Sequence, residues 1–506
     1  MPFVNLPGAV RMHYEVLSTR ASPSTLLDPS KPTLVALVPF YSVQASELPQ
    51  LGPTSPLRES HNVVAFSLRS HGRTVAEVKP THDAFVSAAD LAFAFEALQL
   101  PPSQIYAPGA INGRIAIAFS VLFPELVSAL LLAAPSGRSA MTSNEGFKTL
   151  DASMFNPSDV EDLHEIMAEL ALQLYGDYAP AERMDDLINL LLRRHNPRHA
   201  TRSYDLCRLA YLSMSLTDAA VAEIKAPVLL LSGEHDSCSA ATRSEEWENL
   251  LTGSSAVEAH TIPDSPHLFF YTHADETLSH LVSFLSRHPS PDSSAPASPD
   301  LQKALRTCAS ISSSGKNVLL RNPRNPESYS VMSVEEKDES AKDIERMKIF
   351  EREWLGKPLA PGAEGGEPWD EGFWGRVARP RWRWSRRHDA QPTSDRTASA
   401  RFSVASEVVV NVASVQETVK VSGEVSPTMM SVVESKVLPT VPASDDEEDD
   451  EDALDSDSSS EDGLRERKDS GFVDAVDDLD SGKQVGVVES MSRLALEQNP
   501  TAQVVA

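Results

Sequence analysis

Short β-branched and apolar runs alternate with stretches of helical periodicity from the N-terminus to about residue 288. This alternation is typical of an α/β protein with a mainly parallel sheet whose strands are covered on both faces. We predict a hairpin over 3–16 and further strands at 32–40, 62–67, 104–108, 127–135, 227–232 and 257–262. Apolar residues recur three and four positions apart in the intervening stretches, which predicts amphipathic helices at 84–98, 113–123, 242–251 and 274–285.

One long segment interrupts this alternation. Residues 139–223 have a helical pattern without a convincing strand, and they lie between the fifth and sixth main strands. We expect them to form a helical cap over one edge of the sheet. Residues 1–288 would then be a single α/β domain, which is a plausible length for such a fold.

The composition changes after Arg287. Residues 289–332 begin with a Ser/Pro-rich stretch and are predicted to be a linker with little to bury. Residues 333–388 are expected to hold an isolated charged helix and then a Trp/Arg-rich segment, and 389–506 to be a disordered acidic tail. The tail includes a run at 445–462 with 12 acidic residues among 18, which favours extension by self-repulsion.

The Trp/Arg-rich segment, residues 369–387, is the most unusual part of the C-terminal region. It predicts docking to a protein groove or to an anionic membrane surface, with contact to the acidic parts of this chain as the alternative. The net charge of −28 argues against nucleic acid as a partner. Three scattered cysteines and the lack of a long apolar run favour a soluble, cytoplasmic protein without disulfides or a metal cluster.

Two segments of the first domain resemble the α/β-hydrolase family, most closely the AB-hydrolase-1 type proteins of fungi. The family's nucleophile elbow, following helix and next strand are similar to GAINGRIAIAFSVLFPELVSALLLAAP, residues 109–135. Its D-x-R-G-H-G loop is similar to VVAFSLRSHGRT at 63–74, with Ser67 and Ser70 where the family usually has Asp and Gly. The resemblance covers residues 1–288. It implies small esters or other acyl compounds as substrates. We expect no cofactor, and no metal site because no pair of histidines has ligand spacing.

The resemblance also implies a catalytic acid and base. Asp236 follows a strand and the Gly233 turn in LLLSGEHD, and His267 comes 31 residues later in IPDSPH. In the family's chemistry the carboxylate orients the imidazole, which takes the proton of the nucleophile. Cys238 lies two residues after Asp236 and is expected to have a structural role, because the family places no nucleophile there.

The serine nucleophile of the family has no counterpart in this sequence. The G-x-S-x-G motif is GAING at 109–113, so Ile111 stands where the family has serine. That position normally has a positive φ, at which a β-branched residue is strained. Either Ile111 is strained or the elbow has relaxed. The backbone N–H groups of Phe40 and Asn112 are the expected oxyanion donors, although Pro39, where the family has His-Gly, has no N–H.

These features leave more than one function open. The first is a protein of hydrolase ancestry that lacks ordinary serine-hydrolase activity and binds a small molecule under the cap or acts as a scaffold. The second is a serine-independent enzyme, of the lyase or cofactor-free oxygenase type, or a weak hydrolase, that uses Asp236 and His267 on a small acyl or carbonyl substrate. The pair can also be an inherited hydrogen bond without a catalytic role. A hydrogen-bonded pair beside a cavity favours a ligand binder or an enzyme, whereas a filled pocket favours a scaffold.

Overall fold

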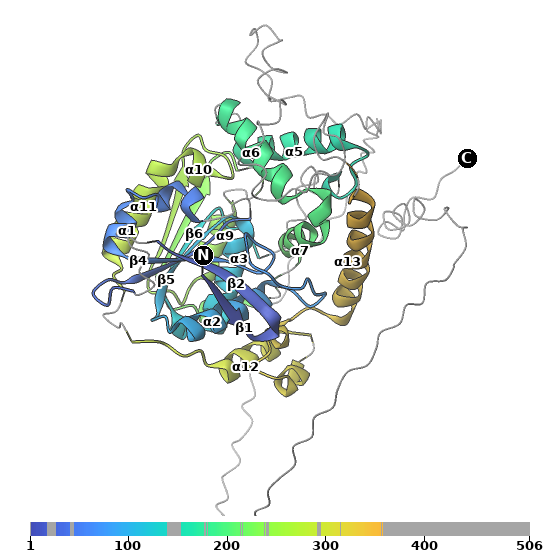
Figure 1. Ribbon diagram of the computed structural model, residues 1–506. Coiled ribbons are helices and arrows are strands. Elements are labelled where there is room, and N and C mark those ends of the chain that lie inside the picture. Colours follow the sequence, from blue (N-terminus) through green and yellow to red (C-terminus); the bar gives the residue numbers. More distant parts are fainter. Residues whose placement is uncertain are drawn as a thin grey trace, which may run out of the picture. The chain divides into compact units, whose positions relative to one another are not determined.

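An eight-stranded sheet forms the centre of the protein in this computed structural model (Figure 1). The strand order is β1-β2-β4-β3-β5-β6-β7-β8, and β2 is antiparallel to both of its neighbours whereas the other pairs are parallel. The strands are Phe3–Leu6 (β1), Val10–Leu17 (β2), Thr33–Leu37 (β3), Asn62–Ser67 (β4), Ser103–Pro108 (β5), Val127–Ala133 (β6), Val228–Gly233 (β7) and Val257–Ile262 (β8). This topology confirms the predicted α/β-hydrolase fold, and the predicted strands are present.

The structure describes residues 2–17, 27–40, 45–138, 153–176, 181–212, 216–236, 242–290, 295–313 and 315–355, together with residues 179, 214, 238 and 357. All of them belong to one compact unit. The predicted Trp/Arg-rich segment and the acidic tail lie outside the described residues. No helix in the described part of the chain is long and apolar enough to cross a membrane.

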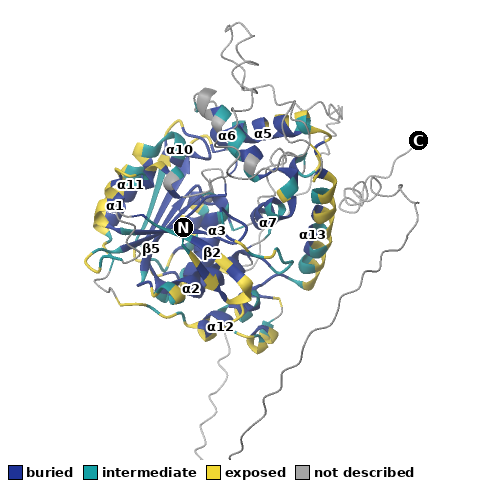
Figure 2. Ribbon diagram, in the orientation of Figure 1, coloured by how far each residue is buried: buried dark blue, intermediate teal, exposed yellow. Residues whose placement is uncertain are grey.

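Helices cover both faces of the sheet, and Figure 2 shows that the strands between them are largely buried. One face packs against α2, α3 and α9, and the other against α1, α10 and α11. The Asp83 side chain caps α2 by accepting hydrogen bonds from the N–H groups of Phe85 and Val86. The six helices are Pro56–Ser60 (α1), Ala84–Leu98 (α2), Ala110–Leu122 (α3), Thr242–Leu250 (α9), Phe269–Thr272 (α10) and Ala274–Arg287 (α11).

The segment predicted to be a cap joins β6 to β7, and its described part includes four longer or well-bounded α-helices. They are Val160–Tyr175 (α5), Ala181–Arg194 (α6), Ala200–Tyr211 (α7) and Asp218–Ala222 (α8). Apolar side chains of α5, α6 and α7 join the buried cluster on the α11 side of the sheet. These helices therefore lie against the sheet domain rather than apart from it.

The chain continues to pack after residue 288, which differs from the prediction. The predicted linker at 289–332 contains α12 (Leu301–Ile311), whose Leu305 and Cys308 belong to the same buried cluster as α3. The Ser/Pro-rich composition ends at Asp300, which caps α12, and the apolar residues that follow recur at helical spacing. The linker prediction is therefore wrong for 301–311.

The predicted charged helix is present as α13 (Val334–Trp354), but it is not isolated, because it lies beside α7 (Figure 1). The Tyr204 hydroxyl of α7 donates to Asp343, and Arg208 of α7 donates to the hydroxyl of Ser340. A buried face of α13, which includes Trp354, meets this side of the cap. Helix α7 is therefore held by the C-terminal segment, residues 301–355.

Candidate functional site

A close approach of two loops brings the predicted acid and base together. Gly233 ends β7, and a Cβ at that position would lie 2.3 Å from the carbonyl oxygen of Pro266, so only glycine allows the loop after β8 to pass there. The N–H of His235 donates to the carbonyl of Ser265 at 2.8 Å, which fixes the two loops side by side. Gly233, which precedes Asp236 in the sequence, is therefore required because a side chain there would clash with Pro266.

Asp236 and His267 form a buried hydrogen-bonded pair. Nδ1 of His267 lies 2.8 Å from Oδ2 and 3.0 Å from Oδ1 of Asp236, and both side chains are almost fully buried. Oδ1 also accepts a hydrogen bond from the N–H of Cys238 at 2.8 Å. The carboxylate therefore orients the imidazole and leaves Nε2 to face away from it. The sequence predicted both residues; their catalytic roles remain predictions.

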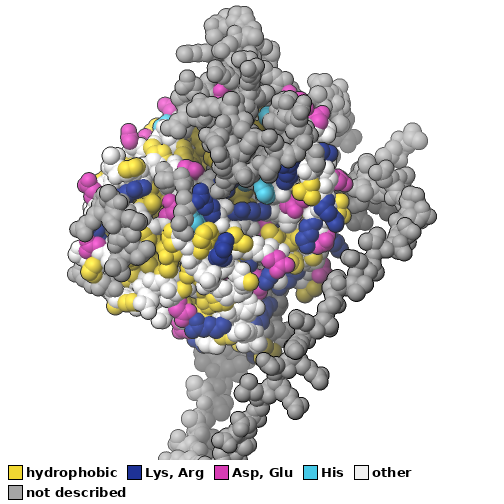
Figure 3. All heavy atoms as spheres, viewed as in Figure 1, with side chains coloured by type: hydrophobic (Ala, Val, Ile, Leu, Met, Phe, Trp, Pro, Cys, Tyr) yellow, Lys and Arg dark blue, Asp and Glu magenta, His cyan; other side chains and the backbone are white. Residues whose placement is uncertain are grey.

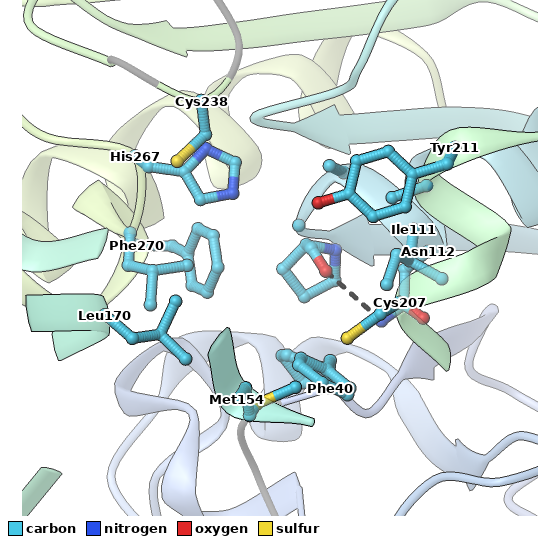
Figure 4. Close-up of a pocket in the computed structure, with 16 residues that line it drawn as sticks. Phe40, Ile111, Asn112, Met154, Leu170, Cys207, Tyr211, Cys238, His267 and Phe270 are labelled. Carbon is cyan, nitrogen blue, oxygen red and sulfur yellow. Dashed lines mark hydrogen bonds between the residues drawn. The ribbon is translucent and has the colours of Figure 1, made fainter. Parts of the chain in front are cut away.

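A largely apolar pocket lies in front of this pair. The cavity itself measures about 40 Å³, and the space between its walls, open solvent included, is about 640 Å³. Figure 4 shows His267 and Tyr211 pointing into the pocket from opposite sides. Its other lining residues are Pro39, Phe40, Pro108, Gly109, Ala110, Ile111, Asn112, Met154, Leu170, Cys207, Ala210, Cys238, Leu268 and Phe270. Such a lining suits a mostly apolar ligand with few polar groups.

The turn between β5 and α3 differs from the strained elbow considered from the sequence. Gly109 has the positive φ of this turn, 89°, and Ile111 lies inside the first turn of α3 with no positive φ. A Cβ at Gly109 would meet no atom within 4 Å. Ile111 is therefore unstrained, and the sequence alternative of a relaxed elbow is the one observed. Ile111 still lines the pocket, so no side chain of Gly109, Ala110 or Ile111 offers a nucleophile there.

Asn112 and Phe40, the predicted oxyanion donors, both line the pocket. The Asn112 side chain has a structural function, because Nδ2 donates at 3.1 Å to the carbonyl oxygens of Leu37, Val38 and Pro108. These contacts tie the ends of β3 and β5 to the start of α3. The backbone N–H of Asn112 belongs to the first turn of that helix. The donor roles stay predictions.

The loop after β4 contacts α7 through buried hydrogen bonds. Ser70 has a φ of 62°, the left-handed conformation that favours glycine. Its hydroxyl donates to Asp205 of α7 at 2.6 Å, and the same carboxylate lies 2.7 Å from Nδ1 of His82 and 2.8 Å from Nη2 of Arg208. Burial alone would raise the pKa of Asp205, but His82, Arg208 and Ser70 outweigh it and lower the pKa.

Two histidines, His71 of this loop and His195 of the cap, are buried. Burial is the main cause that lowers the pKa of His71 to about 4 and the pKa of His195 well below its usual value, with a further contribution from Arg202 to both. The ring of His195 stacks on Phe40 at 4.1 Å between centroids. Both imidazoles are therefore neutral near pH 7, and His195 supports a wall of the pocket.

The sequence did not identify the residues that the cap contributes to the pocket. Cys207, Ala210 and Tyr211 reach it from α7, and Leu170 reaches it from α5. Their helical spacing predicted a buried face but not its partner, because a cap can pack on the sheet in several orientations. Figure 4 shows that the sulfur of Cys238 lies beside the imidazole of His267.

Two groups of side chains in the described residues have a composition suited to metal ions. In the first, one atom each from Asp236, Cys238 and His267 lie within 4.8 Å of one another, and all three residues are buried. The second consists of Glu234, His235 and Asp264, which are exposed. The spacing of residues in the sequence predicted no metal site, because His267 lies 31 residues after Asp236 and 29 after Cys238.

Neither a protein-family model nor a curated protein sequence matches the chain. Many solved structures match its fold. The enol-lactonase of Burkholderia xenovorans is 15% identical over 56% of this chain and 100% of its own, with a TM-score of 0.45. The 2-hydroxy-6-oxo-6-phenylhexa-2,4-dienoate hydrolase of a Rhodococcus species is 17% identical over 56% and 99%, with a TM-score of 0.47. A bacterial membrane phospholipase A is 20% identical over 56% and 85%, with a TM-score of 0.45. At these identities the similarity concerns the fold alone.

Proposed function

We propose that this protein of hydrolase fold lacks ordinary serine-hydrolase chemistry and binds a small, mostly apolar molecule in the pocket under the cap. The turn between β5 and α3 carries this proposal, because Gly109, Ala110 and Ile111 line the pocket without a group that can attack a carbonyl. The space beside His267 favours a ligand binder over a pure scaffold, whose pocket would be filled. On the face that Figure 3 shows, basic and acidic side chains are both spread over the surface, so the pocket is the more specific feature.

Two measurements on the full chain test this proposal. A fluorophosphonate probe, which labels activated serines, should leave the protein unlabelled. A fluorescent medium-chain fatty acyl ester should bind with a change in emission. Ala210→Phe places a ring in the pocket and should abolish binding, whereas Ala219→Phe, on the exposed side of α8, should leave it unchanged. Stoichiometric labelling, or equal binding by wild type and Ala210→Phe, would refute the proposal.

The hydrogen bond between Asp236 and His267 favours a second candidate, a serine-independent enzyme. In it, His267 removes a proton from a bound carbonyl compound or from water, and Asp236 stabilises the imidazolium that forms. Anionic charge on the substrate would then be stabilised by N–H groups at the start of α3. No covalent acyl intermediate is needed.

A substrate screen with variants separates this enzyme from a ligand binder. Lactones, small esters and cyanohydrins are compared with wild type, His267→Ala and Asp236→Asn. General-base catalysis predicts a loss of about 10²-fold or more in His267→Ala. Equal turnover in wild type and His267→Ala would exclude the mechanism.

A further inference from the structure

Asp236, His267 and Cys238 form a group with three different kinds of donor atom. A carboxylate oxygen, an imidazole nitrogen and the thiol sulfur all lie within 4.8 Å of one another, and the three residues are buried. The N–H of Cys238 donates to Oδ1 of Asp236 at 2.8 Å, so the chain turns back at this point and brings the thiol to the carboxylate. We propose that these three side chains bind a Zn²⁺ ion.

The donor set selects the metal. Zn²⁺ is bound in proteins by thiolate, imidazole and carboxylate groups, whereas Mg²⁺ and Ca²⁺ prefer oxygen ligands alone. Two ligands of a tetrahedral zinc ion with bonds of about 2.1 Å lie about 3.4 Å apart. Nδ1 of His267 and Oδ2 of Asp236 are 2.8 Å apart, so sub-ångström movements would let both bind the same ion once the Nδ1 proton has left.

The ion site lies at the edge of the pocket, on the carboxylate side of the His267 ring. His267 and Cys238 line the pocket, while Asp236 lies behind them. Three protein ligands leave a fourth position for water or a ligand, which is the arrangement of catalytic rather than structural zinc sites. The proposal concerns metal binding and does not depend on the proposed function.

Cobalt provides a probe that identifies the sulfur ligand. The full chain is freed of metal with a chelator and then titrated with Co²⁺ under reducing conditions, and the spectrum is followed from the near ultraviolet to the red. We expect an intense thiolate-to-cobalt charge-transfer band that saturates at one ion per chain, and that one equivalent of Zn²⁺ removes. The exposed group of Glu234, His235 and Asp264 cannot produce this band, because it contains no sulfur.

Cys207→Ser is the matched control for Cys238→Ser, since both cysteines line the same pocket and each is 8% exposed. The band should disappear in Cys238→Ser and persist in Cys207→Ser, with circular dichroism showing that both variants are folded. X-ray absorption of the wild-type zinc complex should show one sulfur neighbour, which tests the site without any substitution. No band in wild type, or the same band in Cys238→Ser, would overturn the proposal and leave the group as a hydrogen-bonded pair beside a thiol.

Discussion

Asp205 is the position where we expect one neutralising substitution to weaken several parts of the protein at once. Its buried carboxylate accepts hydrogen bonds from Ser70 at 2.6 Å and Arg208 at 2.8 Å, and lies 2.7 Å from His82. These partners come from the loop after β4, the approach to α2 and α7 itself. Asp205→Asn keeps the shape of the side chain but leaves the buried guanidinium of Arg208 without its carboxylate.

The magnitude follows from that unpaired charge. Removing one partner of a buried ion pair costs about 3–5 kcal/mol. This is a large share of the roughly 5–15 kcal/mol that stabilises a folded domain. Since the pKa of Asp205 is lowered in the folded protein, its contribution is complete above the unfolded pKa of about 3.9 and is lost as the pH falls towards the native value. The full effect should therefore be seen at pH 7.

Urea unfolding of the full chain, followed by tryptophan fluorescence and circular dichroism, measures this cost. Glu345→Gln is the control, because Glu345 pairs with Lys348 on the exposed side of α13 and should change the free energy of unfolding by less than about 1 kcal/mol. Asp205→Asn combined with Arg208→Met should cost less than the sum of the two single changes. A loss below about 1 kcal/mol in Asp205→Asn would refute the reasoning that this carboxylate holds α7 in place.

Three further predictions concern other parts of the molecule. The unfolded chain takes up a proton on His71 near pH 6.5, whereas the folded chain does so only near pH 4. The free energy of unfolding should therefore fall by about 3 kcal/mol as the pH is lowered from 6.5 to 4. In His71→Asn this part of the pH dependence should be absent, as measured by urea unfolding at several pH values. Leu305→Ala should cost about 2–5 kcal/mol in thermal unfolding, while the exposed Leu320→Ala should be nearly neutral; equal effects would contradict the packing of α12. Ile111→Ser should form no acyl-enzyme with activated esters in mass spectrometry, since the positive φ of the turn belongs to Gly109 and not to residue 111. Acylation of this variant would show that residue 111 occupies the position of the family's nucleophile.

The sheet was predictable because its strands are local in sequence. The central strands are short apolar runs bounded by polar or turn-forming residues, and parallel strands buried on both faces require such runs. The positions of Asp236 and His267 were predictable for a related reason, since each follows a strand in the order that the family resemblance implies. Their hydrogen bond depends on Gly233, whose close approach to Pro266 the sequence alone does not reveal.

The C-terminal segment was not predictable from composition. Its Ser/Pro-rich start favoured a linker, and the charged face of α13 favoured an isolated helix. Both features describe the solvent side, whereas packing depends on the few apolar positions of the other side, such as Leu305 and Trp354. The cap residues that line the pocket were missed for a similar reason, because a helix such as α7 shows that it has an apolar face without showing which surface that face covers.

The C-terminal segment and the pocket are connected through α7, and this connection constrains the function. Tyr211 and Cys207 reach into the pocket from one face of α7, while Tyr204 and Arg208, on the neighbouring face, bind α13. A helix held between two elements in this way has few alternative positions, because each would break buried hydrogen bonds. Ligand binding should therefore stabilise α13 as well as the cap, and hydrogen exchange of α13 amides should slow when the pocket is filled. Unchanged exchange in α13 alongside slower exchange in α7 would show that the cap responds to ligand independently of the C-terminal segment.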